Sequence, residues 1–359
     1  MDNVLYEIKT SNVEKNRKIY FRHSAFQDYE SMPSQFYVQI SNETLNIKSQ
    51  RYRTGKYGET LSNVYDSNLY DHVCKIIILG GSSTETRWVD EKSRWPAFME
   101  SELKKLGKDV AVFNFGTGGQ NLNHSIIKYF SFIAEIEPDV VLMAHEANDI
   151  GKSLKGGYYV QEADLYNAYR IENEKKSIQR RVKSLFTSTL PYSYNFIRDY
   201  RNKSYAKKIL THDVVPYRTS SEEFIGLSPT EASKNFFARV AALDAFISND
   251  DGEFFLIEYP EVYDAVINSK SDFNKQPRQE LTRISALNGL SKEEYYQYWL
   301  EFRTTLKKML DNSNIKIIYK NDNLSVNDFY DAIHFNEKGS EKYAKYLADE
   351  IISYDICKK

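Results

Sequence analysis

The sequence predicts an α/β fold with three layers (α/β/α), in which helices cover both faces of a five-stranded parallel sheet in a flavodoxin-like arrangement. Two observations lead to this prediction. Apolar runs bounded by glycine, proline or polar residues recur along the chain, as in strands that are buried on both faces. Helical patterns alternate with these runs, and this alternation is typical of crossover connections between parallel strands. The 359 residues are enough for a sizeable core.

Five apolar runs are expected to form the strands of this sheet. The first is residues 75–79, an uninterrupted Lys-Ile-Ile-Ile-Leu run that is followed by Gly80 and Gly81. The other four runs are residues 110–115, 139–144, 254–258 and 315–319. Ligands of open α/β sheets bind outside the carboxyl ends of the strands. The polar residues that follow these runs are therefore the candidates for function.

Helical patterns fill the intervals between the strands. Apolar residues recur at helical spacing within residues 94–106 and 125–135. Two later helices are expected to begin at Ser228 and Ser291, because each serine has a glutamate three residues later, which is the pattern of a capping box. A last helix is expected over residues 337–353.

Two stretches do not follow the alternation of strands and helices. Residues 1–70 are uneven and polar, with short alternating segments at 36–40 and 45–48, and they predict a β-rich extension packed on a main domain of residues 71–359. Residues 152–227 predict a helical insertion in that domain. Between residues 152 and 210 there are 13 Lys/Arg and 5 Asp/Glu, so the insertion is either a solvated surface or a lid or docking surface for an anionic partner.

The composition argues against several classes of protein. A hydrophobic content of 41% and a charged content of 27% are typical of a soluble globular protein. The net charge of −2 argues against a nucleic-acid-binding protein. The N-terminus has neither the basic nor the apolar region of a signal peptide, and no run reaches the roughly 18 apolar residues of an integral membrane segment. A cytoplasmic location is expected, unless a leader has been removed.

Neither a metal nor a cofactor is expected. The only cysteines are Cys74 and Cys357, so the sequence predicts no disulfide framework and no paired-cysteine metal site. The His-Glu-x-x-His pattern of zinc hydrolases is absent. The glycine turn of residues 116–119 follows a strand but lacks the Gly-x-Gly-x-x-Gly spacing of a dinucleotide site.

Four places in the chain carry the groups that acyl transfer from an ester requires. Ser82 follows the first predicted strand, and a serine becomes a nucleophile beside a histidine base. Asp331 and His334 lie three residues apart, a spacing that lets the carboxylate orient the imidazole. The tetrahedral oxyanion needs preorganised hydrogen-bond donors. The backbone N–H groups of Ser82 and Gly119 and the side-chain amide of Asn148 are the candidates, each at a different strand end.

In order and spacing, these blocks resemble the SGNH (GDSL-type) hydrolase superfamily, in a Gly-Gly-Ser variant. The blocks are Gly80-Gly81-Ser82, Asn114-x-Gly116-x-x-Gly119, Ala147-Asn148-Asp149 and Asp331-x-x-His334. The resemblance implies a three-layer fold and ester hydrolysis through an acyl-enzyme, without metal or cofactor. It implies a catalytic triad of Ser82, Asp331 and His334.

Two positions depart from the family pattern. Gly81 stands where the family has the aspartate of its Gly-Asp-Ser block, and Glu146 stands where a glycine usually precedes the asparagine by two residues. Glu146 is expected to narrow the pocket or to add a charge beside the oxyanion hole. His145 and Arg87 are further candidates for substrate contact. For both, packing within the protein is the alternative.

The leading hypothesis is a serine esterase that removes a short acyl group from a carbohydrate or a similar small polar molecule. Family precedent favours an acetyl group. Two alternatives stay open: an O-acyltransferase with the same triad, and a non-catalytic module that binds a glycan or a partner protein. The sequence does not specify the acyl chain, the alcohol, the pathway or the oligomeric state.

Overall fold

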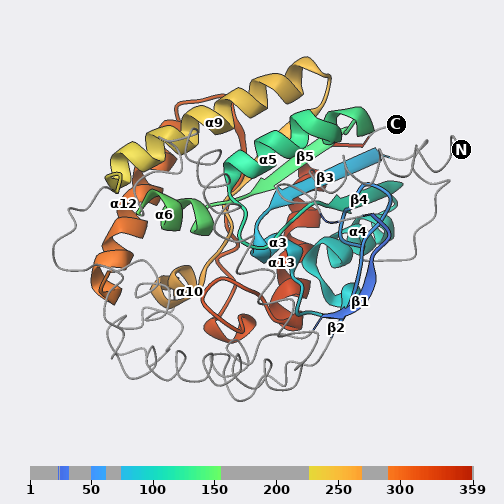
Figure 1. Ribbon diagram of the computed structural model, residues 1–359, viewed down its shortest axis with the longest axis horizontal. Helices are drawn as coiled ribbons and strands as arrows, with labels where there is room; N and C mark the ends of the chain where they lie inside the picture. Colours follow the sequence, from blue (N-terminus) through green and yellow to red (C-terminus); the bar gives the residue numbers. More distant parts are fainter. Residues whose placement is uncertain are drawn as a thin grey trace, which may run out of the picture.

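The computed structural model describes residues 23, 25–31, 50–61, 74–154, 226–268 and 290–357. Within these ranges, five parallel strands form one sheet in the order β4-β3-β5-β6-β7 (Figure 1). Numbered along the chain, this order is the 2-1-3-4-5 order of flavodoxin-like folds. The predicted fold class is confirmed. The strands are β3 (Cys74–Gly80), β4 (Val110–Asn114), β5 (Val140–Ala144), β6 (Glu253–Ile257) and β7 (Lys316–Ile318).

The first apolar run forms a central strand because both of its faces are covered. The side chains of Ile76, Ile77 and Ile78 are 0% exposed in β3, which pairs with β4 on one side and β5 on the other. Burying one such side chain contributes about 1.5–3 kcal/mol. The register places Gly80 opposite Ala144, so the residues that follow β3 and β5 leave the sheet at the same edge.

Helices cover both faces of the sheet (Figure 1). On one face, α4 (Trp95–Lys105) packs against α13 (Glu337–Ser353). On the other, α9 (Pro229–Asn249) packs against α12 (Lys292–Leu310) and α5 (Leu122–Lys128). None of the described helices has the length and apolar character needed to cross a membrane. The shorter elements are the α-helices α3 (Ser82–Glu85), α6 (Ala147–Ser153) and α10 (Val262–Asn268), the 3-10 helices η2 (Glu91–Ser93), η4 (Ala134–Ile136) and η6 (Val326–Asp328), and the π-helix η3 (Tyr129–Ile133).

The helix starts follow the capping patterns of the sequence. At the start of α9, Ser228 Oγ accepts the Glu231 N–H, and the Glu231 carboxylate accepts the Ser228 N–H. The start of α12 repeats this arrangement, and α13 spans the predicted residues. The helix expected from residue 125 begins earlier, because the side chains of Asn121 and His124 form a capping box.

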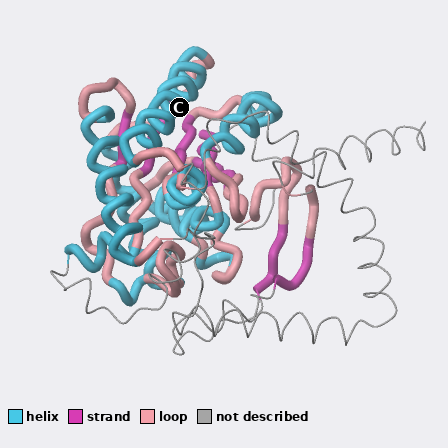
Figure 2. Tube along the Cα trace, turned by 60° about the vertical axis from the view of Figure 1, so that its left-hand side comes forward, coloured by secondary structure: helices cyan, strands magenta, loops and turns pink. Residues whose placement is uncertain are grey.

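A small hairpin lies before the main domain in the chain. Strands β1 (Asp28–Ser31) and β2 (Gln50–Arg53) pair antiparallel, and Figure 2 shows them side by side beyond the edge of the main sheet. After β2, the Thr60 N–H donates to Asn114 O at 2.7 Å, which joins this segment to the carboxyl end of β4. The segments 36–40 and 45–48, and all of the insertion except its ends, lie outside the described residues. The domain boundaries stay a prediction.

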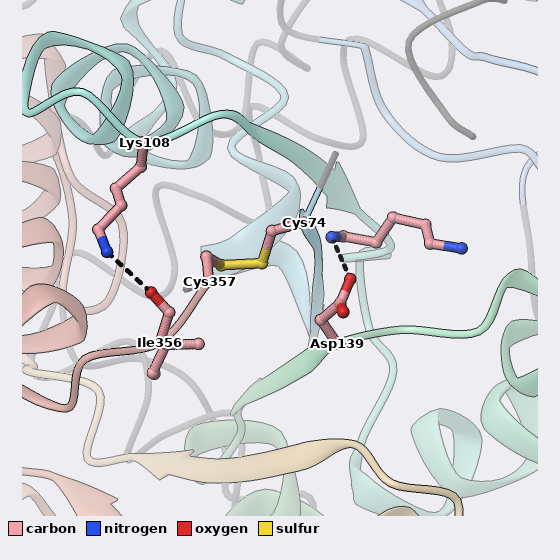
Figure 3. Close-up of a disulfide and its surroundings, with 6 residues drawn as sticks. Cys74, Lys108, Asp139, Ile356 and Cys357 are labelled. Atoms are coloured by element: carbon pink, nitrogen blue, oxygen red, sulfur yellow. Dashed lines mark hydrogen bonds between the residues drawn. A yellow bond between two sulfur atoms is a disulfide. The ribbon is translucent and has the colours of Figure 1, made fainter. Parts of the chain in front are cut away.

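The structure joins Cys74 and Cys357 in a disulfide, so the prediction of no disulfide framework was wrong (Figure 3). Their Cα atoms lie 5.5 Å apart, where β3 begins and where the chain leaves α13. The Lys108 ammonium donates to Ile356 O at 3.2 Å and holds this end in place. The cysteines are 283 residues apart in the sequence, and only the fold brings them together. The cytoplasmic location stays a prediction.

Removing this disulfide is expected to lower the free energy of unfolding by about 2–4 kcal/mol. The bond closes a loop that contains the whole main sheet, and a long closed loop restricts the unfolded chain most strongly. Urea unfolding of Cys74→Ala/Cys357→Ala beside the oxidised wild type measures the loss. The reduced wild type should match the double variant. Equal unfolding midpoints for oxidised and reduced protein would contradict the prediction.

Candidate active site

Ser82 is the first residue of α3, directly beyond the carboxyl end of β3. A Cβ on the preceding Gly81 would lie 2.7 Å from Asn148 Nδ2 and 3.1 Å from Gln120 O. Glycine permits this close approach without displacing the Asn148 amide. The first N–H groups of a helix have no partner within the helix. Ser82 therefore presents both a hydroxyl and a backbone N–H at the edge of the sheet.

His334 bridges Ser82 and Asp331. Its Nε2 lies 2.8 Å from Ser82 Oγ, and its Nδ1 lies 2.6 Å from Asp331 Oδ2. The other carboxylate oxygen of Asp331 accepts the backbone N–H groups of Ile333 and His334 at 2.9 and 2.8 Å, which fixes the carboxylate. Beside that carboxylate, Nδ1 carries the proton and Nε2 is left to accept from Ser82. The structure thus brings together the three residues predicted as the triad.

Two aromatic rings fix the plane of the His334 imidazole. The Tyr330 ring is parallel to it within 4°, with the centroids 5.4 Å apart. The edge-on Trp88 ring lies 5.7 Å from it. The Tyr330 N–H also donates to His334 O at 3.0 Å. Tyr330 was not among the predicted site residues, and its one signal in the sequence is its position next to Asp331.

The predicted oxyanion-hole donors lie around the glycine turn after β4. Gly119 has φ +75°, a conformation that favours glycine, and it is exposed. Neither its N–H nor that of Ser82 has a hydrogen-bond partner within the described ranges. Asn148, on α6 after β5, donates one amide N–H to Gln120 O at 2.7 Å, and its other amide N–H has no hydrogen-bond partner among the described residues. A Cβ on Gly118 would lie 3.9 Å from Ser82 Cβ, so this turn lies beside the serine.

His145, a candidate for substrate contact, belongs to a second Ser/His/Asp set. Its Nε2 lies 2.7 Å from Ser125 Oγ, and its Nδ1 lies 3.7 Å from Asp149 Oδ2. Burial holds the pKa of His145 well below its ordinary value, so the ring is neutral. All three residues are at most 3% exposed. Ser82, by contrast, is only half-buried and can meet a substrate.

The other two candidates for substrate contact also have partners within the protein. The Arg87 guanidinium donates to Glu85 Oε1 at 2.7 Å and lies 4.7 Å from the centre of the Tyr52 ring. Glu146 is buried, and its Oε2 accepts from Arg303 Nε at 2.6 Å. These contacts explain the orientation of both side chains by packing within the protein, which was the alternative to substrate contact. As substrate contacts, all three candidates stay predictions.

Arg303 lies at the centre of a buried acidic cluster that holds the start of α6. Besides Glu146, its guanidinium donates to Asp264 Oδ2 at 2.7 Å and lies 3.8 Å from Glu261 Oε1. Burial raises the pKa of Glu146 to about 8 and that of Glu261 to about 7, against the lowering effect of Arg303. The cluster therefore retains a proton near neutral pH. Because Glu146 directly precedes α6, this cluster anchors the helix that carries Asn148.

This cluster is expected to make the protein less stable as the pH rises from about 5 to about 8, by about 1–3 kcal/mol. In the unfolded chain Glu261 loses its proton near its ordinary pKa of 4.5, and in the folded protein near 7. Between these values unfolding releases a proton, so a rising pH favours the unfolded state. Glu261→Gln, which mimics the protonated acid, should flatten this slope. Urea unfolding across this pH range gives the free energy of unfolding of both proteins. If that free energy depends on pH equally in the wild type and in Glu261→Gln, the prediction is contradicted.

The groups at this edge of the sheet have the chemistry of acyl transfer. They are a hydroxyl, an imidazole beside a carboxylate, and N–H donors, which are the groups that attack on an ester and stabilisation of its oxyanion require. Across the described ranges, no group of three or more His, Cys, Asp or Glu side chains is arranged to hold a metal ion.

Solved esterase structures are similar to this chain at low identity. An acetyl xylan esterase, AlAXEase, is 13% identical over 79% of this chain and 100% of its own, with a TM-score of 0.38. The psychrotrophic esterase EstA from Pseudoalteromonas sp. is 12% identical over 78% and 98%, with a TM-score of 0.39. A member of the lipolytic protein G-D-S-L family from Veillonella parvula DSM 2008 is 14% identical over 78% and 98%, with a TM-score of 0.40.

A comparison with curated protein sequences found no match. The family model of the GDSL-like lipase/acylhydrolases matches residues 76–347, a range that contains Ser82, Gly119, Asn148, Asp331 and His334. This range is well over half of the chain. The chain therefore belongs to the GDSL-like lipase/acylhydrolase family.

Proposed function

We propose that this protein is a serine esterase in which Ser82 is the nucleophile, His334 the general base and Asp331 the carboxylate that orients it. The observation that carries the proposal is the continuous chain of short contacts from Asp331 through His334 to Ser82 Oγ, at 2.6 and 2.8 Å. This chain ends at a half-buried serine beside N–H donors, in contrast to the buried set around His145.

In the first half-reaction, Ser82 Oγ attacks the ester carbonyl while its proton passes to His334 Nε2. The negative charge that develops on the carbonyl oxygen is stabilised by the Ser82 and Gly119 N–H groups and the free amide N–H of Asn148. Asp331 stays ionised and stabilises the imidazolium. Collapse of the intermediate breaks the ester C–O bond, and the alcohol leaves with the proton from Nε2. An acyl-enzyme on Ser82 remains.

In the second half-reaction, water takes the place of the alcohol. His334 Nε2 removes a proton from the water, whose oxygen attacks the acyl carbonyl. The same donors hold the second oxyanion, and the proton on Nε2 returns to Ser82 Oγ as the acid is released. Water is the one co-reactant, and Ser82 and His334 end the cycle in the protonation states in which they began it.

The substrate in this proposal is a short-chain ester, an acetyl ester by family precedent, of a carbohydrate or a similar polar alcohol. The leaving alcohol approaches His334 Nε2, and the half-buried Trp88 ring stands beside that imidazole. A flat aromatic face suits the apolar face of a sugar ring, which supports a carbohydrate alcohol. Gly81, in place of the usual aspartate, makes this a Gly-Gly-Ser form of the site.

Hydrolysis of p-nitrophenyl esters from acetyl to decanoyl, followed by acetate release from acetylated mono- and disaccharides, tests the substrate. The proposal predicts the highest kcat/KM for the acetyl ester and a fall with chain length. A rate that rises up to octanoyl or beyond would overturn the short-acyl assignment. Transfer to an added free sugar in preference to water would establish the acyltransferase. No turnover of any ester would favour the binding module.

A further inference from the structure

Glu85 is a buried carboxylate beside the nucleophile to which the proposed mechanism gives no task. It ends α3, three residues after Ser82, and is 3% exposed. Its Oε2 accepts the backbone N–H of Gly118 at 2.9 Å. Gly118 directly precedes Gly119, whose N–H is one of the proposed oxyanion donors. The carboxylate thus holds the turn that carries this donor.

The other oxygen of Glu85 faces the N-terminal segment. Tyr52 OH donates to Oε1 at 3.0 Å, His23 Nε2 lies 3.0 Å from it, and Arg87 Nη2 donates to it at 2.7 Å. Burial acts to raise the pKa of Glu85, but these three partners outweigh it and lower the pKa to about 2. The carboxylate is therefore ionised throughout the range in which an esterase works.

Tyr52 brings the hairpin to this carboxylate. It lies on β2, is fully buried, and shares its hydroxyl with Thr60 Oγ1 at 2.9 Å. The guanidinium groups of Arg87 and Arg94 lie 4.7 and 5.3 Å from the centre of its ring. Arg94 also donates to the backbone carbonyl of Arg51 at 3.2 Å. The hairpin is thereby fixed against the main domain at the place where Glu85 meets the glycine turn.

The rest of the glycine turn is held from within the main domain. The Thr117 N–H donates to Gly80 O at 3.1 Å, and the buried Lys128 ammonium donates to Thr117 Oγ1 at 2.9 Å. The Gly118 N–H, by contrast, is held by Glu85. Glycine backbones rotate more freely than others, so the Glu85 contact sets the direction in which the neighbouring Gly119 N–H points.

We propose that Glu85 is a positioning residue for the oxyanion hole, and that the N-terminal hairpin completes the active site by holding Glu85 through Tyr52. The proposal rests on the proposed esterase function, because it assigns a task within that reaction. It gives a role to a region for which the sequence offered no chemistry.

Glu85→Gln is expected to lower kcat about tenfold or more with little change in KM; loss of a complete oxyanion donor costs about 10²–10³-fold. The glutamine carbonyl is drawn to the Arg87 and Tyr52 donors, which turns its NH2 group toward the Gly118 N–H. Two donors then face each other, and the turn rotates. Tyr52→Phe removes one hydrogen bond to Glu85 and should lower kcat in the same direction, by about twofold to fivefold.

Arg53→Gln is the matched control for loosening of the hairpin. Arg53 follows Tyr52 on β2 and is joined to Glu91 at 2.8 Å, away from Glu85. Its loss should lower the melting temperature but leave kcat unchanged.

Binding of a short alkyl boronic acid gives a second readout for Glu85→Gln. Its tetrahedral serine adduct places a charged oxygen in the oxyanion hole, so its inhibition constant should rise in Glu85→Gln in proportion to the fall in kcat.

Wild-type ester turnover and boronate inhibition come first. If the wild type shows neither, the proposed function fails and the Glu85 proposal falls with it. If the wild type is active and Glu85→Gln keeps its kcat and boronate affinity, the Glu85 proposal alone is overturned. If kcat falls equally in Arg53→Gln at matched melting temperature, the effect is general loosening of the hairpin, and the positioning role is wrong.

Discussion

Ser82→Ala is expected to lower kcat for p-nitrophenyl acetate by about 10⁴-fold or more, down to the background that the donors alone provide. The variant removes the hydroxyl that lies 2.8 Å from His334 Nε2, and no acyl-enzyme can form. The melting temperature should change little, because this half-buried hydroxyl forms no hydrogen bond other than the one to His334 within the described residues. Initial rates at saturating ester measure the loss.

Ser83→Ala is the matched control for Ser82→Ala. Ser83 is the adjacent hydroxyl in the same short helix, and its backbone carbonyl accepts from Trp95 Nε1 at 3.0 Å. That contact survives the substitution, so kcat should stay within about threefold of the wild type. If Ser83→Ala were as inactive as Ser82→Ala, or if Ser82→Ala kept wild-type turnover, the assignment of the nucleophile would be wrong.

Asp331→Asn is expected to lower kcat by about 10³–10⁴-fold with KM nearly unchanged. Its Oδ1 accepts two backbone N–H groups, and the asparagine carbonyl takes that position. The asparagine NH2 group then faces His334 Nδ1, which becomes an acceptor, and the proton moves to Nε2. In that tautomer His334 donates to Ser82 and is unable to take its proton. Steady-state kinetics on the acetyl ester give both parameters.

Asp328→Asn separates this effect from a general loss of structure. Asp328 lies three residues before Asp331 and accepts from Ser325 N and Lys342 Nζ at 2.7 and 2.8 Å. Neither hydrogen bond involves His334. Its substitution should cost stability without the fall in kcat. Equal kcat losses in the two variants at matched stability would argue against a specific role of Asp331 in orienting the imidazole.

The sheet was predictable because its strands are continuous apolar runs with clear ends. The Ile-rich run before Gly80 is buried on both faces. It is too short and too uniformly apolar for an amphipathic helix, and two glycines end it. The capping boxes at Ser228 and Ser291 placed two helix starts correctly. The proximity of Ser82 to the glycine turn and Asn148 followed from the rule that strand ends gather at one edge of a parallel sheet. The pairing of Ser82 with His334, which lies between β7 and α13, was implied by the resemblance to the SGNH superfamily.

Contacts between distant segments were not predictable from local pattern. Glu85 and Tyr52 are 33 residues apart, and Cys74 and Cys357 are 283 apart. The local pattern around each of these residues carries no signal for its distant partner. Glu146 shows a second difficulty. As an acidic residue beside Asn148 it suggested a charge in the pocket, but its carboxylate is buried against Arg303, which comes from a helix 157 residues later in the chain.

The most direct test of the esterase proposal is the mass of the intact protein after reaction with a fluorophosphonate, followed by peptide mapping. This reagent labels an activated serine through the same attack and the same oxyanion donors. We expect one adduct, on Ser82, which is lost in Ser82→Ala and retained in Ser83→Ala. An unmodified wild-type protein, or an adduct on another serine with Ser82 free, would contradict the proposal.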